Sequence, residues 1–473
     1  MTSPQKGNMT FRTTISSMRV FLLIWFGQVI SLIGSELTGF GLGVWVYQRT
    51  GSATQFALIA VATTLPGIVL SPLAGAVVDR LDRRLVLILS DTGAALSTLS
   101  IALLIMTGQL QTWHIYVLMG ISSAFSAFHW PAFAASISLL VPKQHFGRAG
   151  GMVEFGQATA QTVSPVIAGL LIVAIQLGGI VLIDVATFLF AVTTLLLVRI
   201  PKPEKSAEDA VEASSFWRDV GYGWRYVTAR RGLFALLFFF ASINFSAAAI
   251  GVLIPPLVLS FTTVEVLGTV LSVAFAGMVL GSITMSVWGG PKPGRRMGVV
   301  IALAFLQGVL IIIDGLQPSA LLITAVGFVY LFVSPIITGS DQAIWLSKTP
   351  PSLQGRVFAT QRMMSWSTVP LAFLVAGPLA DYVFGPLLVE GGPLAGSVGQ
   401  IIGVGPGRGI GLLFIVMGTL MVLVTIVASL YPRLTRLEQE LPDAVPDAEE
   451  APPAEESAIG AEGAVAAAAS RGP

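Results

Sequence analysis

Glu36, His129 and Asp341 are ionisable side chains that lie deep within long apolar runs of this sequence. A carboxyl or an imidazole in apolar surroundings can bind and release a proton near neutral pH. Ionisable residues inside membrane-spanning segments are rare and mark the paths of protons or ligands. We therefore predict that these residues bind a proton or a cationic ligand, with Glu36 as the main candidate.

Each of the three also has a plainer reading. Glu36 could be a structural carboxyl that bonds to hydroxyl groups of neighbouring helices. His129 could be a packing residue with a satisfied hydrogen bond. Asp341 could pair with Arg362 near the cytoplasmic end of its segment, either as a gate that breaks during function or as a static ion pair.

The composition identifies the class of protein in which these residues must work. Of the 473 residues, 54% are hydrophobic and 11% are charged, whereas a soluble domain carries about 25% charged residues. Cysteine is absent, which excludes disulfides, Cys-ligated metals and thiol catalysis. The net charge of +1 gives no basic field for nucleic acid. The chain is therefore expected to be an integral membrane protein.

Twelve apolar runs are each long enough to cross a bilayer, which takes about 20 residues. Backbone groups in hydrocarbon must bond within their own segment, so each run is expected to be a helix. The predicted spans are 19–47, 53–78, 85–107, 113–141, 150–176, 179–200, 232–260, 265–288, 297–316, 319–347, 357–384 and 408–431. We predict an all-α integral membrane protein with twelve transmembrane helices.

The basic residues predict the orientation of the chain, because Lys and Arg gather in cytoplasmic loops. With both termini cytoplasmic, only Arg49 and Arg408 of the 26 basic residues fall in outer loops. Those on the cytoplasmic side include Lys6, Arg12, Arg19, Arg80, Arg83, Arg84, Lys143, Arg148, Lys292, Arg295, Arg296, Lys348 and Arg356.

The second half of the chain repeats the first. Arg83-Arg84 follows span two and Arg295-Arg296 follows span eight, while Gly147-Arg148 and Gly355-Arg356 follow spans four and ten. Two halves of the same orientation form a parallel repeat, in which a substrate site lies near the midplane between the halves. The expected units are a cytoplasmic N-terminus (1–18), a six-helix half (19–200), a linker (201–231), a second six-helix half (232–432) and a disordered cytoplasmic tail (433–473).

Within the linker, Phe216, Trp217, Val220, Trp224 and Val227 recur at helical spacing beside several arginines. This pattern is typical of an amphipathic helix on the inner membrane surface. A polar linker with a few aromatic residues is the alternative.

The loop between spans two and three reads GAVVDRLDRR, from Gly75 to Arg84. Gly75 permits close helix packing, and Asp79 is an anion placed to meet a helix N-terminus. An ordinary positive-inside turn would explain the arginines but not Asp79 four residues after Gly75. The run resembles the loop signature of the major facilitator superfamily, with Asp82 where a second glycine is usual.

Further segments resemble one branch of that superfamily, the drug-efflux permeases related to macrolide exporters and the enterobactin exporter. They are FLLIWFGQVISLIGS in span one, SAFHWPAFAASISLLVPKQ in span four and GRVFATQRMMSWSTVPLAFLVAGPLAD in span eleven. The resemblance implies secondary active export of amphipathic compounds in exchange for protons, across a cytoplasmic membrane. It also implies that the loop motif latches the cytoplasmic side in one conformation.

The expected cytoplasmic latch comprises Gly75, Asp79, Arg80, Arg83, Arg84, Asp91, Glu154, Arg356 and Arg362. Asp91 could pair with the arginines of the loop in a structural role. Glu154 could complete the latch with Arg356 or cap its own helix.

Span five carries Ser164, Pro165 and Gly169, a partial match to the antiporter signature of the superfamily in which Ser replaces the first Gly. A proline bend filled by small residues is the alternative. Span four lacks the arginine typical of many drug–proton antiporters.

The wall of the expected cavity is aromatic and amide-rich, which suits an amphipathic ligand. The predicted lining residues are Trp25, Gln28, Phe125, Phe128, Gln157, Asn244, Phe245 and Trp366. Aromatic residues that face lipid look the same in a sequence. Asp184, Asp314 and Asp381 lie near the outer ends of their spans, and we expect them to be solvated or paired there, without a transport role.

The sequence thus predicts a transporter and not an enzyme, working as a monomer with an amphipathic small molecule, protons and membrane lipid as its partners. No cofactor, metal or nucleic acid is expected, and Gly403–Gly409 lacks the context of a phosphate loop. An uptake symporter for a small metabolite and a non-transporting receptor or partner subunit are the alternatives.

Overall fold

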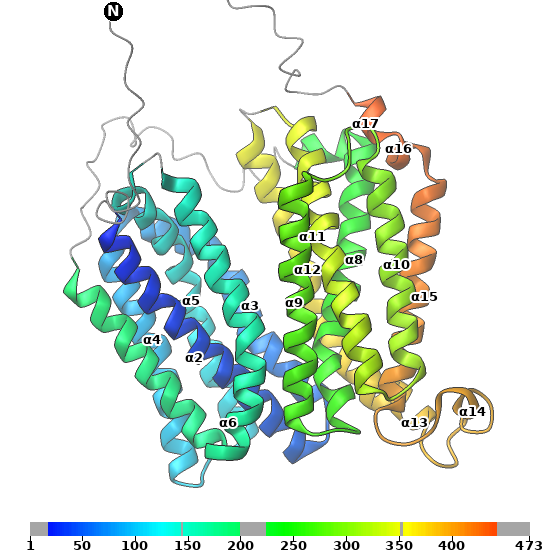
Figure 1. The fold of residues 1–473 in the computed structure, drawn as a ribbon, viewed down its shortest axis with the longest axis horizontal. Coiled ribbons are helices and arrows are strands. Elements are labelled where there is room, and N and C mark those ends of the chain that lie inside the picture. The colour runs from blue at the N-terminus through cyan, green and yellow to red at the C-terminus, as the bar shows by residue number, and fades with distance from the viewer. Residues whose placement is uncertain (1–17, 143–144, 199–223, 351–352, 442–473) are drawn as a thin grey trace, which may run out of the picture.

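The computed structural model describes residues 18–142, 145–198, 224–350 and 353–441. The described parts form two bundles of long helices that stand side by side (Figure 1). Ten helices in these parts are long and apolar enough to cross a membrane, counting the interrupted helix α6 once. The all-helical membrane fold is therefore confirmed, while the number of twelve spans and the side of the termini stay predictions.

The first bundle contains α2 (Arg19–Thr50), α3 (Ala53–Arg80), α4 (Arg83–Met106), α5 (Thr112–Leu140) and α6 (Phe146–Leu197). Helix α6 is broken at Gln176, whose φ of 57° and ψ of 179° are not helical. Its two helical parts, 146–175 and 177–197, agree within a few residues with the predicted spans five and six.

The second bundle contains α8 (Arg231–Leu259), α9 (Val264–Trp288), α10 (Arg296–Leu316), α11 (Ala320–Lys348), α12 (Gln354–Pro378) and α15 (Arg408–Leu430). Helix α12 continues into a π-helical turn, η4 (Leu379–Phe384), and two short helices follow, α13 (Gly385–Leu387) and α14 (Val398–Ile402). Helices α16 (Pro432–Thr435) and α17 (Leu437–Glu440) end the described chain.

Local capping explains why the first helices start and stop where they do. Gly51, with φ 63°, ends α2 in the left-handed conformation that glycine adopts without strain. Ser52 then accepts a hydrogen bond from the backbone N–H of Gln55 and starts α3. Asp82 accepts from the N–H of Arg84 and starts α4. An N-cap role therefore accounts for an aspartate where the family usually has glycine.

The two bundles meet through α3 with α12 and through α6 with α9. The contacts are backbone-close: a Cβ on Gly377 would lie 2.6 Å from Cα of Thr54, and one on Gly169 would lie 3.1 Å from the carbonyl of Val264. The backbone N–H of Val166 also donates to Ser272 Oγ across the boundary, at 3.2 Å.

These contacts lie toward the end of the bundles where α2 ends and α3 begins. The opposite end, which we call the basic end, carries Arg83, Arg84, Arg295 and Arg296. Toward the basic end, Leu73, Val287 and Phe155 are exposed on the helices that join the two bundles. The structure is therefore one in which the halves are closed on each other at the end away from the basic loops.

The end of the C-terminal half is more ordered than the sequence indicated. Leu434 and Leu437 are buried, and the Glu438 carboxylate accepts from the N–H groups of Gly294 and Met297 at 3.0 and 3.4 Å. The prediction that disorder begins at 433 is wrong for residues 433–441, because the segment packs on α8 at Gly232 and a capping carboxylate holds it at the start of α10. The rest of the expected tail lies outside the described residues.

The expected amphipathic helix lies mostly outside the described residues, which leaves Phe216, Trp217 and Val220 without a structural account. At its end, Trp224 is exposed and Val227 is buried. The Tyr226 hydroxyl donates to the carbonyl of Lys348 at 3.0 Å, which ties the end of the linker to α11.

Candidate functional site

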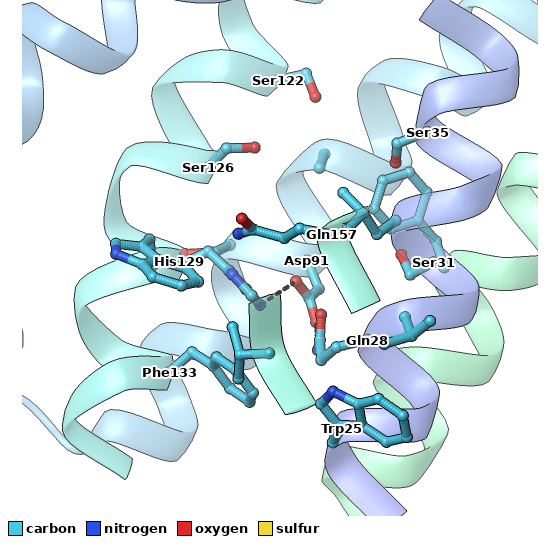
Figure 2. A pocket seen from close by; sticks show the side chains of 17 residues that line it. Trp25, Gln28, Ser31, Ser35, Asp91, Ser122, Ser126, His129, Phe133 and Gln157 are labelled. Carbon is cyan, nitrogen blue, oxygen red and sulfur yellow. Dashed lines mark hydrogen bonds and ion pairs between the residues drawn. The ribbon is translucent and has the colours of Figure 1, made fainter. Parts of the chain in front are cut away.

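A cavity of about 260 Å³ lies inside the first half, between α2, α4, α5 and α6. More than half of the residues that line it are polar. Figure 2 shows side chains of these helices converging on it. The polar lining residues are Gln28, Ser31, Ser35, Ser90, Asp91, Ser122, Ser126, His129 and Gln157.

Asp91 is the central charged group of this cavity, and its whole residue is 5% exposed. One carboxylate oxygen lies 3.3 Å from Nε2 of His129 on α5. The other accepts a hydrogen bond of 2.9 Å from the side-chain amide of Gln28 on α2. Three helices thus supply one carboxylate, one imidazole and one amide within contact distance, as Figure 2 shows.

This arrangement can hold a proton at a defined place. A protonated His129 and an ionised Asp91 form a neutral ion pair, whereas loss of one proton leaves the pair with a net negative charge. Removing an isolated charge from water costs far more than removing a paired one.

Close helix packing and one hydrogen bond from a tryptophan hold the helices around the cavity in place. Next to the cavity, small residues let the helices pack closely: a Cβ on Gly93 of α4 would enter the ring of Phe125 of α5, and one on Gly156 of α6 would lie 2.6 Å from Val29 of α2. The indole N–H of Trp25 donates to the carbonyl of Met152 at 2.9 Å. Trp25 is thereby fixed across the α2–α6 boundary at the edge of the cavity.

A second cavity, of about 420 Å³, lies inside the second half between α8, α9, α10 and α11. Its wall is mostly apolar. Its polar lining residues are Asn244, Gln307, Asp314, Tyr330, Ser334 and Thr338.

The structure places the three predicted proton-binding residues in different surroundings. His129 lines the first cavity. Glu36 is exposed on α2 and does not line either cavity, although Leu32, one turn earlier, lines the first. Asp341 is buried on α11, and its Oδ1 accepts no hydrogen bond from the described residues.

The described side chains of Asp341 and Arg362 form no ion pair in this conformation. The static pair is therefore wrong, whereas a gate that breaks during function stays a prediction. Arg362 is exposed and its guanidinium lies 5.9 Å from the ring centroid of Trp366, on the same helix. The buried carboxyl of Asp341 instead neighbours Trp345, one turn along α11.

The expected cytoplasmic latch is only partly visible. The side chains of Asp79, Arg80 and Arg356 lie outside the described ones, as does the close surrounding of Gly75. Glu154 is exposed at the start of α6.

Two of the latch arginines, Arg83 and Arg84, bind helix carbonyls. Arg84 donates to the carbonyls of Leu195 and Leu196 at the end of α6, where carbonyls lack helical partners. Arg83 donates to the carbonyl of Ala135 at 2.8 Å. The expectation that Asp91 pairs with these arginines is wrong, because Asp91 lies two helical turns further along α4 and faces α2 and α5.

Three predicted lining residues, Trp25, Gln28 and Gln157, line the first cavity. Asn244 lines the second, and Phe245 lines a small apolar pocket beside α12 and α15. Phe125, Phe128 and Trp366 line none of these three spaces, since Phe128 packs on the core of the first half and Trp366 is exposed.

The span-five residues serve the contact between the halves. A Cβ on Gly268 of α9 would strike the carbonyl oxygen of Pro165, and Gly169 faces Val264 of α9. Ser164 donates to the carbonyl of Ile33 at 3.5 Å. Small residues here allow two backbones to touch.

Sequence reasoning misjudged two of the outer aspartates. Asp184 is 1% exposed and accepts from Ser35 and Thr98 at 3.4 and 3.5 Å. Asp314 is 5% exposed and lines the second cavity. Both are enclosed within their halves and not solvated at an interface. The apolar sequence around each aspartate was a partial indication that the residue is buried.

The remaining outer aspartate, Asp381, joins the two halves. Its carboxylate accepts from the hydroxyl of Ser52 at 2.6 Å and from the N–H groups of Ala53 and Thr54 at 3.1 and 2.8 Å. A carboxylate of the second half therefore caps the N-terminus of α3 in the first half.

Comparison with known families agrees with this architecture. The model of the Major Facilitator Superfamily matches residues 24–373, which is most of the chain. The chain belongs to the Major Facilitator Superfamily. It is therefore a multi-pass membrane transporter of the superfamily, and its bacterial efflux relatives are consistent with a place in the cytoplasmic membrane.

Among curated relatives, macrolide efflux protein A of Streptococcus pyogenes is 30% identical over 372 residues, covering 77% of this chain and 90% of that protein. The multidrug efflux pump Tap of Mycolicibacterium fortuitum is 28% identical over 380 residues, covering 76% and 89%. The predicted branch of the superfamily is confirmed by these relatives.

Solved structures share the fold at low identity. A bacterial homolog to the human lysosomal transporter Spinster, solved in an inward-facing and unoccupied conformation, gives a TM-score of 0.62 at 15% identity, over 92% of this chain and 98% of that one. A POT family transporter in complex with 5-aminolevulinic acid gives 0.64 at 13% identity, over 89% and 100%.

Proposed function

We propose that this protein exports amphipathic small molecules by exchange for protons, and that the Asp91–His129 pair is the proton site. The observation that carries the proposal is the buried carboxylate with an imidazole at 3.3 Å in a hydroxyl-lined cavity. Histidine is a common proton carrier in proteins, which supports this pair as the place where a proton is held.

Charge burial links the proton to the conformation. The protonated pair is neutral and can be enclosed between helices, whereas the deprotonated pair carries a net negative charge that favours contact with water. Loading a proton from outside therefore favours one arrangement of the halves, and its release inside favours the other. Exchange follows if cargo stabilises the arrangement that the proton does not.

Glu36 remains a second candidate for proton binding. It is an exposed carboxyl on α2, one turn beyond the cavity residue Leu32. A charged side chain in a spanning helix faces water or protein and not lipid, which supports its position on a water-filled path between the halves.

The cargo class is supported by the relatives, which are named for macrolide and multidrug efflux. The cavity walls agree, because apolar surfaces with a few polar groups bind amphipathic molecules. The uptake alternative predicts a cation deep in the cavities to hold an anionic nutrient, and none of the residues that line the two cavities is Lys or Arg.

Expression in a bacterium without its own macrolide pumps tests the direction of transport. Cells with the wild-type chain should accumulate less radiolabelled erythromycin than cells without it, and Asp91→Asn and His129→Gln should remove the difference. His114→Gln, outside both cavities, is the matched control. Raised accumulation with the wild type would support uptake and overturn the proposal.

A further inference from the structure

The second cavity contains two buried acceptor atoms that no described group satisfies. Oδ1 of Asp314 and Oε1 of Gln307 accept no hydrogen bond, although their residues are only 5% and 2% exposed. Both residues lie on α10 and line the same cavity, with Ile311 between them on the same helix face. Buried polar atoms are usually bonded, so two open acceptors in one cavity call for an explanation.

The orientation of Gln307 follows from its partners. Its side-chain nitrogen donates to the carbonyl of Tyr330 at 3.1 Å and to the hydroxyl of Ser334 at 2.9 Å. A backbone carbonyl can only accept, so the amide nitrogen must face Tyr330 and the oxygen must point away from it. The open acceptor is therefore fixed by the fold.

The rest of the wall is mostly apolar, and its described residues supply no counter-ion. The described lining residues include no Lys, Arg or His. Phe240, Ile254, Leu271 and Phe275 supply aromatic and aliphatic surface around the space of about 420 Å³. An occupant that fits such a wall has an apolar body and a positively charged donor group that reaches the carboxylate.

The first cavity differs in this respect. Its carboxylate, Asp91, already has His129 and Gln28 as partners. The two halves therefore differ: the carboxylate of the first half has an imidazole and an amide beside it, whereas Oδ1 of Asp314 in the second half has no described partner.

We propose that the cavity of the second half is a binding site for lipophilic amines, in which the ammonium group of the ligand meets Asp314 and Gln307 and its apolar body fills the space between α8, α9 and α11. This inference rests on the proposed export function and names the cargo class that the second half selects. It assigns Asp314 a role in ligand binding that is separate from proton coupling at Asp91.

A matched pair of fluorescent ligands tests the site. Monodansylcadaverine carries one aliphatic ammonium on an apolar dansyl body, and its N-acetyl derivative has the same body without the charge. Binding of each to the purified full-length protein is measured by fluorescence titration. We expect Asp314→Asn to weaken amine binding at least about tenfold, as for loss of a charged hydrogen bond, and to leave the weak binding of the acetylated ligand unchanged.

Two further variants test the second acceptor and provide a matched control. Gln307→Leu should also weaken amine binding, without a change of charge. Thr338→Val is the control, because Thr338 lines the same cavity but its hydroxyl already bonds to the carbonyl of Ser334. The ligand-free Asp314→Asn protein should melt no lower than the wild type, since the variant loses only an unpartnered buried charge.

The result that overturns the site is amine binding that is unchanged in Asp314→Asn, or that falls equally for the charged and the acetylated ligand. A melting temperature of ligand-free Asp314→Asn well below the wild type would also overturn it, because the carboxylate would then be structural. Asp91→Asn separates the two proposals: it should retain amine binding in detergent while it loses proton-coupled export.

Discussion

Removing the carboxylate of Asp381 is predicted to loosen the contact between the two halves. This side chain caps the first turn of α3 through Ser52, Ala53 and Thr54, at 2.6, 3.1 and 2.8 Å. Loss of a helix N-cap typically costs about 1 kcal/mol, and loss of an anion at a helix N-terminus costs about 0.3–1 kcal/mol. Asp381→Ala should therefore weaken this conformation by roughly 1.3–2 kcal/mol, which shifts a two-state equilibrium roughly 9- to 30-fold.

The assay uses the absence of cysteine from the chain. Ala57 is 1% exposed on α3 and belongs to the core cluster of the second half. A single cysteine at this position should react slowly with an impermeant maleimide added outside intact cells, and faster when Asp381→Ala is also present. Glu390→Ala, an exposed acid in the same region of the chain, is the control.

Labelling that is the same with and without Asp381→Ala, in protein that still inserts in the membrane, would refute the reasoning. The same increase in Glu390→Ala would refute it too, because the effect would then not depend on the cap. Asp381→Asn, which keeps one acceptor oxygen, should lie between the wild type and Asp381→Ala.

Two further substitutions test the packing of the halves and of the C-terminal end. Gly268→Val should place side-chain atoms against the carbonyl of Pro165 and cost about 1–3 kcal/mol of stability, seen as a lower melting temperature. Gly39→Ala is its control, because a Cβ there meets nothing within 4 Å. Equal melting temperatures of the two variants would contradict the packing described. Glu438→Ala should lower the free energy of unfolding by about 1 kcal/mol, because Gly294 and Met297 lose their acceptor at the start of α10. Glu440→Ala removes only an exposed pair with Arg433 and should leave the melting temperature unchanged. Equal losses of stability in both variants would argue against a capping role.

The helices could be predicted from the sequence because bilayer thickness and hydrogen bonding leave few alternatives. The break at Gln176 is an example, since predicted span five ends at this residue. Asp82 shows the limit of motif reasoning. Its departure from the family pattern left the turn uncertain, and its role as an N-cap is visible only in the contact with Arg84.

The partners of the charged residues could not be predicted, because they depend on the rotation of each helix about its axis. Asp91 lies two turns from Arg83 and Arg84 on α4, so pairing with them was plausible from spacing alone. Its actual partners come from α2 and α5. Glu36 was favoured for its depth in span one, but depth does not tell which face of a helix meets a cavity.

Asp381 could not be recognised for a different reason. Its partners lie more than 300 positions earlier in the chain, at Ser52, Ala53 and Thr54. Contacts of this kind depend on how the halves stand against each other, which neither composition nor periodicity records.

Proton exchange is the central claim, and cargo-driven proton flux in liposomes tests it most directly. The purified protein is reconstituted with a pH-sensitive dye inside, and erythromycin is added on one side. We predict that protons move opposite to the erythromycin gradient, that Asp91→Asn and His129→Gln abolish this flux, and that His114→Gln retains it. Full cargo-driven flux in Asp91→Asn, or protons that move in the same direction as the cargo, would contradict the account.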